Sequence, residues 1–186
     1  MFNFSPFPNL TSERLTLRKL RLEDENEVFF LRSDDRILKF IDIPVAKSLE
    51  DARAYIKMIN KGIDENEWVF WGITLKEAES KIIGTICLWN ISKEKNKGEI
   101  GYMLHPDFER KGYMQEAAVR VIDFGFNTMN LNVIDANLHS KNDKSLKLLK
   151  RNNFTYKKES KNMVIYSLPK NEWMLKTSKN QPRPVP

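Results

Sequence analysis

The alternation of apolar and polar residues divides the chain into short strands and longer helices. Residues 14–20 (RLTLRKL) alternate in the manner of a half-buried strand. Residues 22–34 begin with acidic side chains and then turn apolar. Residues 48–63 carry apolar side chains at helical spacing, and Ser48 is a suitable N-cap. Both of these stretches therefore predict helices.

Three runs rich in β-branched and aromatic residues follow, over residues 68–75, 81–91 and 98–105. The connections between them are short and charged, and such connections favour antiparallel hairpins over crossovers. The sequence therefore predicts three strands that pair in chain order. Their aromatic residues either fill the core or line a binding cleft; these are Trp68, Phe70, Trp71 and Trp89.

The second half of the chain predicts a crossover. An amphipathic helix is expected over residues 113–129. Strands 98–104 and 133–139, on either side of it, should be parallel neighbours with a right-handed connection. A short basic helix and two closing strands follow, at residues 142–152, 154–159 and 162–168. The predicted fold class is α/β (α+β), with a mixed, mostly antiparallel sheet.

The length of 186 residues is enough for one domain with a core and short for two. We expect that domain over residues 10–175, between a flexible N-terminus at 1–9 and a disordered, proline-containing tail at 176–186. No apolar run approaches the roughly 18 residues of a membrane span, and the N-terminus lacks the pattern of a signal peptide. A single cysteine, Cys87, suits a reducing compartment, so a cytoplasmic protein is expected.

The net charge of +6 is unevenly distributed. Residues 141–186 hold twelve Lys and Arg against three Asp and Glu, a charge of +9, which leaves −3 for residues 1–140. A basic region of this kind suits a nucleic acid or a small polyanion such as a nucleotide-containing cofactor, and it is also compatible with a merely solvated face. Basic and aromatic residues do not interleave here, so nucleic acid is not the expected partner.

The stretch before the crossover helix concentrates charge and flexibility where a helix begins. Arg110, Lys111 and Gly112 stand together at that point. The first N–H groups of a helix lack intrahelical partners, and the helix dipole places partial positive charge there. Such a turn is either a solvated connection or a seat for a pyrophosphate. It is neither the three-glycine dinucleotide fingerprint nor a Walker loop.

The run GEIGYMLHPDFERKGYMQEAA, residues 98–118, resembles the acetyl-CoA-binding motif of the GNAT N-acetyltransferase superfamily. It is most similar to the branch that includes ribosomal-protein N-terminal acetyltransferases. Further stretches match in the family's order from about residue 10 to residue 175: LTSERLTLRKLRLEDENEVFFL, SLEDARAYI, NDKSLKLLKRNNF and YSLPKNEW. The resemblance implies the GNAT acyl-CoA N-acyltransferase fold, a seven-stranded sheet with helices on both faces.

The resemblance also implies acetyl-CoA as co-substrate, with no metal, and a set of residues that bind it. Backbone groups of Tyr102, Met103 and Leu104 would pair with the pantetheine arm. The amides of Arg110, Lys111, Gly112, Tyr113, Met114 and Gln115 would hold the pyrophosphate. Asn142 would lie beside the pantetheine and Ser145 close to the thioester sulfur. Four positions depart from the family pattern: Glu109, Met114, Leu149 and Asn153.

The implied reaction is direct attack of a neutral primary amine on the thioester, which requires a proton acceptor for the amine and a proton donor for the thiolate. Glu99 is the candidate base, and the alternative is a half-exposed strand acid or an ordered water in the role of base. Ser145 is the candidate donor, and the alternative is a plain serine at a helix N-terminus. His105 and His139 lie on different strands without metal-ligand spacing.

Two functions follow as hypotheses. The first is an acetyl-CoA-dependent N-acetyltransferase whose acceptor is a protein N-terminal α-amine or a small-molecule amine. The second is a non-catalytic GNAT-fold module that binds CoA or a nucleic acid. The protein would act as a monomer or a homodimer.

Overall fold

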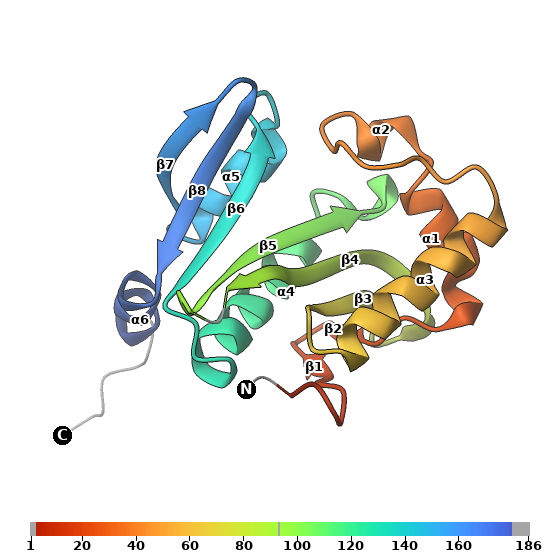
Figure 1. Ribbon diagram of the computed structural model, residues 1–186, viewed down its shortest axis with the longest axis horizontal. Coiled ribbons are helices and arrows are strands. Elements are labelled where there is room, and N and C mark those ends of the chain that lie inside the picture. The colour runs from red at the N-terminus through yellow and green to blue at the C-terminus, as the bar shows by residue number, and fades with distance from the viewer. Residues whose placement is uncertain (1–2, 93, 180–186) are drawn as a thin grey trace.

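The computed structural model describes residues 3–92 and 94–179, and it is built around one sheet (Figure 1). The strand order is β1-β2-β3-β4-β5-β6-β8-β7, and every neighbouring pair is antiparallel except β5 and β6. The strands are β1 (Leu10–Thr11), β2 (Leu15–Arg18), β3 (Val69–Leu75), β4 (Ala78–Ser92), β5 (Lys97–Leu104), β6 (Val133–His139), β7 (Thr155–Ser160) and β8 (Met163–Pro169). The predicted mixed, mostly antiparallel sheet is confirmed.

The expected count of seven strands was wrong by one. Leu10 and Thr11 pair with Leu17 and Thr16, and a hydrogen bond from the Ser12 amide to the Leu15 carbonyl closes the turn between them. A strand of two residues is too short to show a period of two in the sequence, so its pairing comes entirely from this turn.

The helices are η1 (Leu22–Asp24), α1 (Glu25–Leu31), α2 (Asp35–Leu38), α3 (Leu49–Asp64), η2 (Pro106–Phe108), α4 (Tyr113–Asp123), η3 (Phe124–Thr128), α5 (Asp143–Arg151) and α6 (Lys170–Lys179). Ser48 caps α3 as predicted, because its side chain accepts from the Asp51 amide. The helix expected over residues 113–129 is α-helical only to Asp123 and ends in the π-helical turn η3. The short helix α2 was not predicted.

Consecutive residues of β3 show that helices cover both faces of the sheet. Phe70 packs against Tyr55 of α3, with ring centroids 6.2 Å apart. Trp71, the next residue, packs against Phe124 at the end of α4, at 5.4 Å. Since adjacent strand residues point to opposite faces, α3 and α4 lie on opposite sides of the sheet (Figure 1). The expected two-sided arrangement of helices is confirmed.

The parallel pair β5–β6 is real but short. It is limited to Lys97, Gly98 and Glu99 opposite Val133, Ile134 and Asp135. Beyond these residues β5 pairs only with β4, and β6 only with β8. Figure 1 shows the two strands running apart from a common end. The C-terminal half of β5 therefore presents one backbone edge without a strand partner among the described residues.

The two ends of the chain hold more structure than the pattern indicated. Phe4 is buried, its amide donates to Asn66 Oδ1, and the Trp71 indole donates to the Pro8 carbonyl. The flexibility expected for residues 1–9 stays a prediction. Helix α6 includes the first four residues of the expected tail at 176–186, and residues 180–186 lie outside the described part of the chain.

Candidate active site

The loop between β5 and α4 has an unusual backbone. Gly112, the N-cap of α4, has φ of 83°, and Arg110 has φ of 61°. Glycine adopts such an angle freely, whereas arginine rarely does, and such residues gather at functional loops. The first amide of α4 that bonds within the protein is that of Glu116, to the Gly112 carbonyl at 3.0 Å. Within residues 3–92 and 94–179, the amides of residues 110–115 have no hydrogen-bond partner.

Arg14, at the N-terminal end of β2, is fixed against this loop. Its Nη1 donates to the Lys111 carbonyl at 3.0 Å, and its guanidinium lies 4.6 Å from the centroid of the Tyr113 ring. Glu116 of α4 holds Arg14 by accepting from its Nε, at 2.8 Å, and from its Nη2, at 2.7 Å. The sequence did not point to Arg14, because 102 residues separate it from Glu116.

Two departures from the family pattern leave the loop amides clear. Glu109 Oε2 lies 2.6 Å from Lys144 Nζ of α5, so its charge is paired. The Met114 side chain is buried in the hydrophobic core and does not crowd the turn. Gln115 likewise turns its side chain away, into a pair of hydrogen bonds with Asn152.

The first turn of α5 faces β5. Asn142 is the N-cap of α5, and its Oδ1 accepts from the Ser145 amide at 3.1 Å. The Tyr102 phenol and the Ser145 side chain lie close enough for Ser145 to lower the pKa of the phenol. Burial raises the pKa of Tyr102 to about 12, against this opposing effect of Ser145. Ser145 thus lies on the side of β5 to which Tyr102 points.

Glu99 lies on the other face of β5, at the last pair before β5 and β6 separate. Burial raises its pKa above the ordinary value. The hydrogen bond from Asn90 Nδ2, at 3.5 Å, opposes the rise, Asp135 adds to it, and Lys97 opposes it. Asp135 is itself buried and accepts from the Ser167 hydroxyl at 2.5 Å. Glu99 is therefore a carboxylate with a stronger affinity for protons than an exposed one.

The strand register fixes these faces. Phe70, Cys87 and Gly101 are paired in one row across β3, β4 and β5, on the α3 side. Glu99 stands two residues from Gly101 and shares this side. Tyr102 belongs to the neighbouring row with Trp71, on the α4 side. The structure therefore does not bring Glu99 and Ser145 together. Glu99 lies on one face of β5 at the start of the β5–β6 separation, and Ser145 lies near Tyr102 on the other face, three residues further along the strand.

The family model described as acetyltransferase (GNAT) domain matches residues 14–155. The chain belongs to the GNAT acetyltransferase family. A Bacillus licheniformis protein, named the uncharacterized N-acetyltransferase p20, is 37% identical over 150 residues, 81% of this chain and 83% of its own length. The putative ribosomal N-acetyltransferase YdaF of Bacillus subtilis is 29% identical over 51% of this chain and 57% of its own.

A solved structure shares the fold of this GNAT acetyltransferase. The ribosomal-protein-S5-alanine acetyltransferase from Vibrio fischeri superposes with a TM-score of 0.76 at 23% identity, over 89% of this chain and 98% of that one. The resemblance to the GNAT family, including its ribosomal-type members, is confirmed. Membership of this family also means that the chain is an enzyme of the acetyltransferase class, and the hypothesis of a non-catalytic module loses its support.

Several other residues of this acetyltransferase have structural roles. Leu149, where some relatives carry a tyrosine acid, is buried in the core. Cys87 is buried, and burial raises the pKa of its thiol to about 12, so it is not a nucleophile. Asn153 has φ of 64°, the left-handed conformation expected where α5 ends. His105 caps η2 by accepting from the Asp107 amide.

Among residues 3–92 and 94–179, no helix has both the length and the apolar character needed to cross a bilayer. The same residues contain no group of three or more His, Cys, Asp or Glu side chains arranged to hold a metal ion. That the reaction needs no metal stays a prediction.

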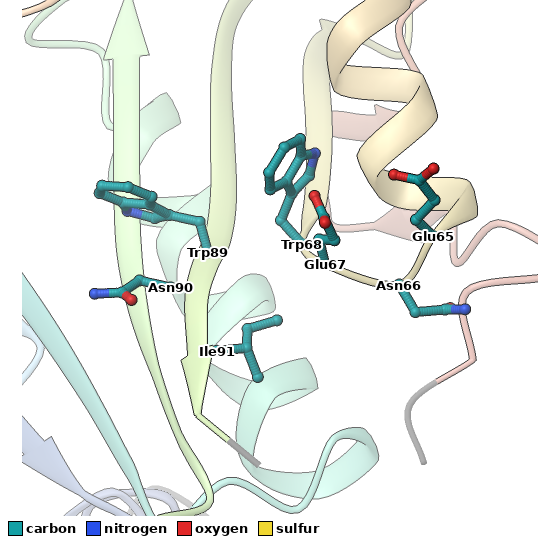
Figure 2. A pocket seen from close by; sticks show the side chains of 7 residues that line it. All are labelled: Glu65, Asn66, Glu67, Trp68, Trp89, Asn90 and Ile91. Atoms are coloured by element: carbon teal, nitrogen blue, oxygen red, sulfur yellow. The ribbon is translucent and has the colours of Figure 1, made fainter.

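A pocket of about 400 Å³ lies between the end of α3 and the end of β4. Figure 2 shows the side chains that line it. Its lining residues are Glu65, Asn66, Glu67, Trp68, Trp89, Asn90 and Ile91. The four aromatic residues whose role the sequence left open fall into two groups. Phe70 and Trp71 are buried in the core, whereas Trp68 and Trp89 line this pocket.

Proposed function

We propose that this GNAT acetyltransferase is an N-acetyltransferase that moves the acetyl group of acetyl-CoA to a primary amine by direct attack on the thioester. The observation that carries the proposal is the placement of Glu99 and Ser145 on opposite faces of β5, where β5 leaves β6. An amine that loses its proton to Glu99 approaches from the α3 side. The thiolate leaves toward Ser145 on the other side.

The seat for the pyrophosphate is the set of free amides at residues 110–115. Free amides at a helix N-terminus bind anions through directed hydrogen bonds and the helix dipole. Arg14 adds a fixed positive charge beside Tyr113, on the same loop. The formal charges of Arg110 and Lys111, both exposed, add a weaker and more strongly screened attraction.

The unpaired edge of β5 suits the pantetheine arm. Tyr102, Met103 and Leu104 pair with β4 along one edge, and their other edge faces the separation from β6. The pantetheine arm carries two amide groups, which can add to such an edge like a short strand. Asn142 stands at the opposite side of this separation, with its amide nitrogen free to donate among the described residues.

Glu99 is the proposed general base. A base works best when its pKa approaches that of the group that it deprotonates, so burial of Glu99 and the neighbouring Asp135 favour this role. Ser145 is the proposed proton donor to the departing thiolate, since Leu149 leaves no tyrosine in its usual place. Tyr102, which stays protonated at neutral pH, orients the Ser145 hydroxyl.

The acceptor is a protein N-terminal α-amine or a small amine. The ribosomal acetyltransferase names of YdaF and of the Vibrio fischeri protein favour a ribosomal protein N-terminus. The tight connection between β7, which ends at Ser160, and β8, which begins at Met163, favours an open cleft that also admits small amines. A cytoplasmic location, where acetyl-CoA is available, completes the proposal.

Two variants of Gly112 test the pyrophosphate seat. Gly112→Asp and Gly112→Asn place side chains of nearly the same shape at a position with φ of 83°, which Asp and Asn both tolerate better than other residues. Only the aspartate adds a negative charge beside the free amides. We expect acetyl-CoA affinity, measured by calorimetry, to fall at least about tenfold more for the aspartate variant, with a smaller difference at high salt. Equal affinities in the two folded variants would refute the seat.

Turnover is tested separately, by release of free CoA thiol with amines and N-terminal peptides as acceptors. The proposal requires thiol release with at least one primary amine and none with a tertiary amine of similar size. Binding of acetyl-CoA without turnover on any acceptor contradicts it.

A further inference from the structure

Two tryptophan side chains lie on the α3 side of the sheet, and one of them, Trp89, is paired with Glu99 across β4 and β5. The Trp68 indole donates to the Ile59 carbonyl at 3.0 Å and fills the space above Gly62, where a Cβ atom would lie 2.0 Å from the ring. The Trp89 indole lies over Gly101 of β5, where a Cβ atom would lie 3.5 Å from its Nε1. The Trp68 indole is thus fixed by a hydrogen bond, and the Trp89 indole lies against the backbone of β5.

Trp89 is unusual because it is 46% exposed. An indole that is open to solvent at a pocket is typical of a surface that binds a ligand. Trp89 is paired with Glu99 on the neighbouring strand, so their side chains stand on the same face about 5 Å apart at Cβ. Asn90 connects the pocket with Glu99, since it lines the pocket and donates to the Glu99 carboxylate.

The rest of the pocket is acidic. Glu65 and Glu67 are exposed and line it at the end of α3 and just beyond (Figure 2). Lys61 lies 3.7 Å from Glu65, but both side chains are exposed, and such a pair is weak and easily exchanged. Glu67 has no ion-pair partner among the described residues. The pocket thus combines exposed indole surface with carboxylates, and it adjoins Glu99 through Asn90, which lines the pocket and donates to Glu99.

We propose that this pocket, lined by Glu65, Glu67, Trp68 and Trp89, binds the acceptor, and that the acceptor carries a second positive charge beyond its reactive amine. The inference rests on the proposed function, because Glu99, the neighbour of Trp89 on β5, receives the proton of the reactive amine. The second cation lies between the indole faces and the two carboxylates, which attract it through the ring quadrupoles and through charge. An acceptor with a carboxylate at that point is repelled.

A pocket of about 400 Å³ accommodates a short alkyl chain with an amine at each end. The same chemistry occurs at a peptide N-terminus followed by a basic side chain. Both acceptors present a primary amine and a cation several ångströms away, and the experiment below separates them.

The test compares diamines of three to eight carbons with monoamines and amino alcohols of equal length. Thiol release gives kcat/KM for each acceptor at saturating acetyl-CoA. We expect kcat/KM for the best diamine to exceed that of its matched monoamine by about tenfold or more. A second arm uses tetrapeptides with Lys or Leu at position two and tells whether the preferred source of the second charge is a peptide or a small molecule.

Substitutions of pocket residues test whether the preference for diamines arises in this pocket. In the double variant Glu65→Gln with Glu67→Gln, the ratio of diamine to monoamine kcat/KM should fall to about one, mainly through KM of the diamine. Glu159→Gln, an exposed acid on β7, is the matched control and should keep the wild-type ratio. Trp89→Ala should lower the ratio without altering acetyl-CoA affinity.

The outcomes separate this inference from the proposed function. Turnover with no preference for a second charge, or a preference that survives in the double Gln variant, overturns the inference alone. Absence of turnover on every amine overturns the proposed function, and the inference with it. Sedimentation of Trp89→Ala adds a third check, because conversion of a dimer into a monomer would identify the exposed indole as a subunit interface and overturn the inference.

Discussion

Lys144 Nζ lies 2.6 Å from Glu109 Oε2, and this ion pair joins the loop before α4 to the first turn of α5. Both elements border the proposed acetyl-CoA site. Because Lys144 is paired with Glu109, it is not available to bind a phosphate of acetyl-CoA. It also neutralises an acid that would otherwise repel one.

Glu109→Gln should tighten acetyl-CoA binding. The substitution removes the local negative charge and releases Lys144 toward the phosphates, so we expect Kd to fall about two- to fivefold at low salt. Stability should change little, because Lys144 is largely exposed in this pair. Calorimetric titration at two salt concentrations measures the effect. Asp107→Asn, which removes an exposed charge nearby, is the control, and an equal gain there would contradict a specific role of the pair.

Glu99→Gln should lower kcat by about a hundredfold or more while the Kd of acetyl-CoA stays the same, because the variant loses only the proton acceptor. In the wild-type enzyme, kcat/KM should rise with pH through the raised pKa of Glu99, and this acidic limb should be absent in the variant. The pH profile of kcat/KM measures this. An unchanged acidic limb in Glu99→Gln would assign the base to another group.

Glu99→Gln should also affect the stability of the fold, and here we expect no loss, in contrast to the loss of activity. The pKa of Glu99 is raised in the folded state, so the folded protein disfavours the charged carboxylate. The free energy of unfolding therefore falls as the pH rises from the unfolded pKa to the folded pKa of this group. Glu99→Gln removes that loss, so its Tm at pH 7 should equal or exceed that of the wild type. A loss of activity together with a higher Tm separates a catalytic role from a structural one.

Glu116→Gln should weaken acetyl-CoA binding through Arg14. Burial raises the pKa of Glu116, but hydrogen bonds from the Arg14 amide, the Ser12 hydroxyl and the Arg14 guanidinium together bring it below the ordinary value. A lowered pKa stabilises the fold at neutral pH, and this contribution is lost as the pH falls through the folded pKa. We therefore expect a lower Tm at pH 7, and this difference from the wild type should shrink as the pH falls from the ordinary pKa of a glutamate, about 4.3, through the lower folded pKa of Glu116.

Arg14→Lys is the companion variant for the affinity. Lysine keeps the charge but cannot donate to Glu116 and the Lys111 carbonyl at once in the arginine geometry. Acetyl-CoA Kd should rise in both Arg14→Lys and Glu116→Gln. A normal Kd in Glu116→Gln would limit Arg14 to a structural role.

The parts of the site that the sequence predicted are local in the chain. The loop amides around Gly112 depend on one strand, one turn and one helix start, all within about twenty residues, and each has its own sequence signal. The N-cap Asn142 and the left-handed Asn153 likewise depend on neighbours within one helix. Local chemistry was enough to place all of these.

The unpredicted parts depend on contacts between distant segments. Arg14 reaches the loop only because β2 lies near α4 in space, and nothing around residue 14 indicates Glu116. Strand alternation alone implies that Glu99 and Tyr102 point to opposite faces of the sheet. It does not tell which helix covers each face. That assignment came from Tyr55 against Phe70 and from Phe124 against Trp71. The role of Trp89 stayed open for the same reason.

Ser145→Ala should lower kcat by about ten- to a hundredfold with little change in KM for the amine, because the hydroxyl acts on the departing thiolate and not on the acceptor. Tyr102→Phe removes the phenol oxygen beside Ser145 but leaves the Ser145 hydroxyl in place, so its decrease in kcat should be smaller than that of Ser145→Ala. If Tyr102 only orients Ser145, the double variant should be no slower than Ser145→Ala alone. Single-turnover thiol release measures all three. Additive losses in the double variant would show that the phenol donates its own proton to the sulfur.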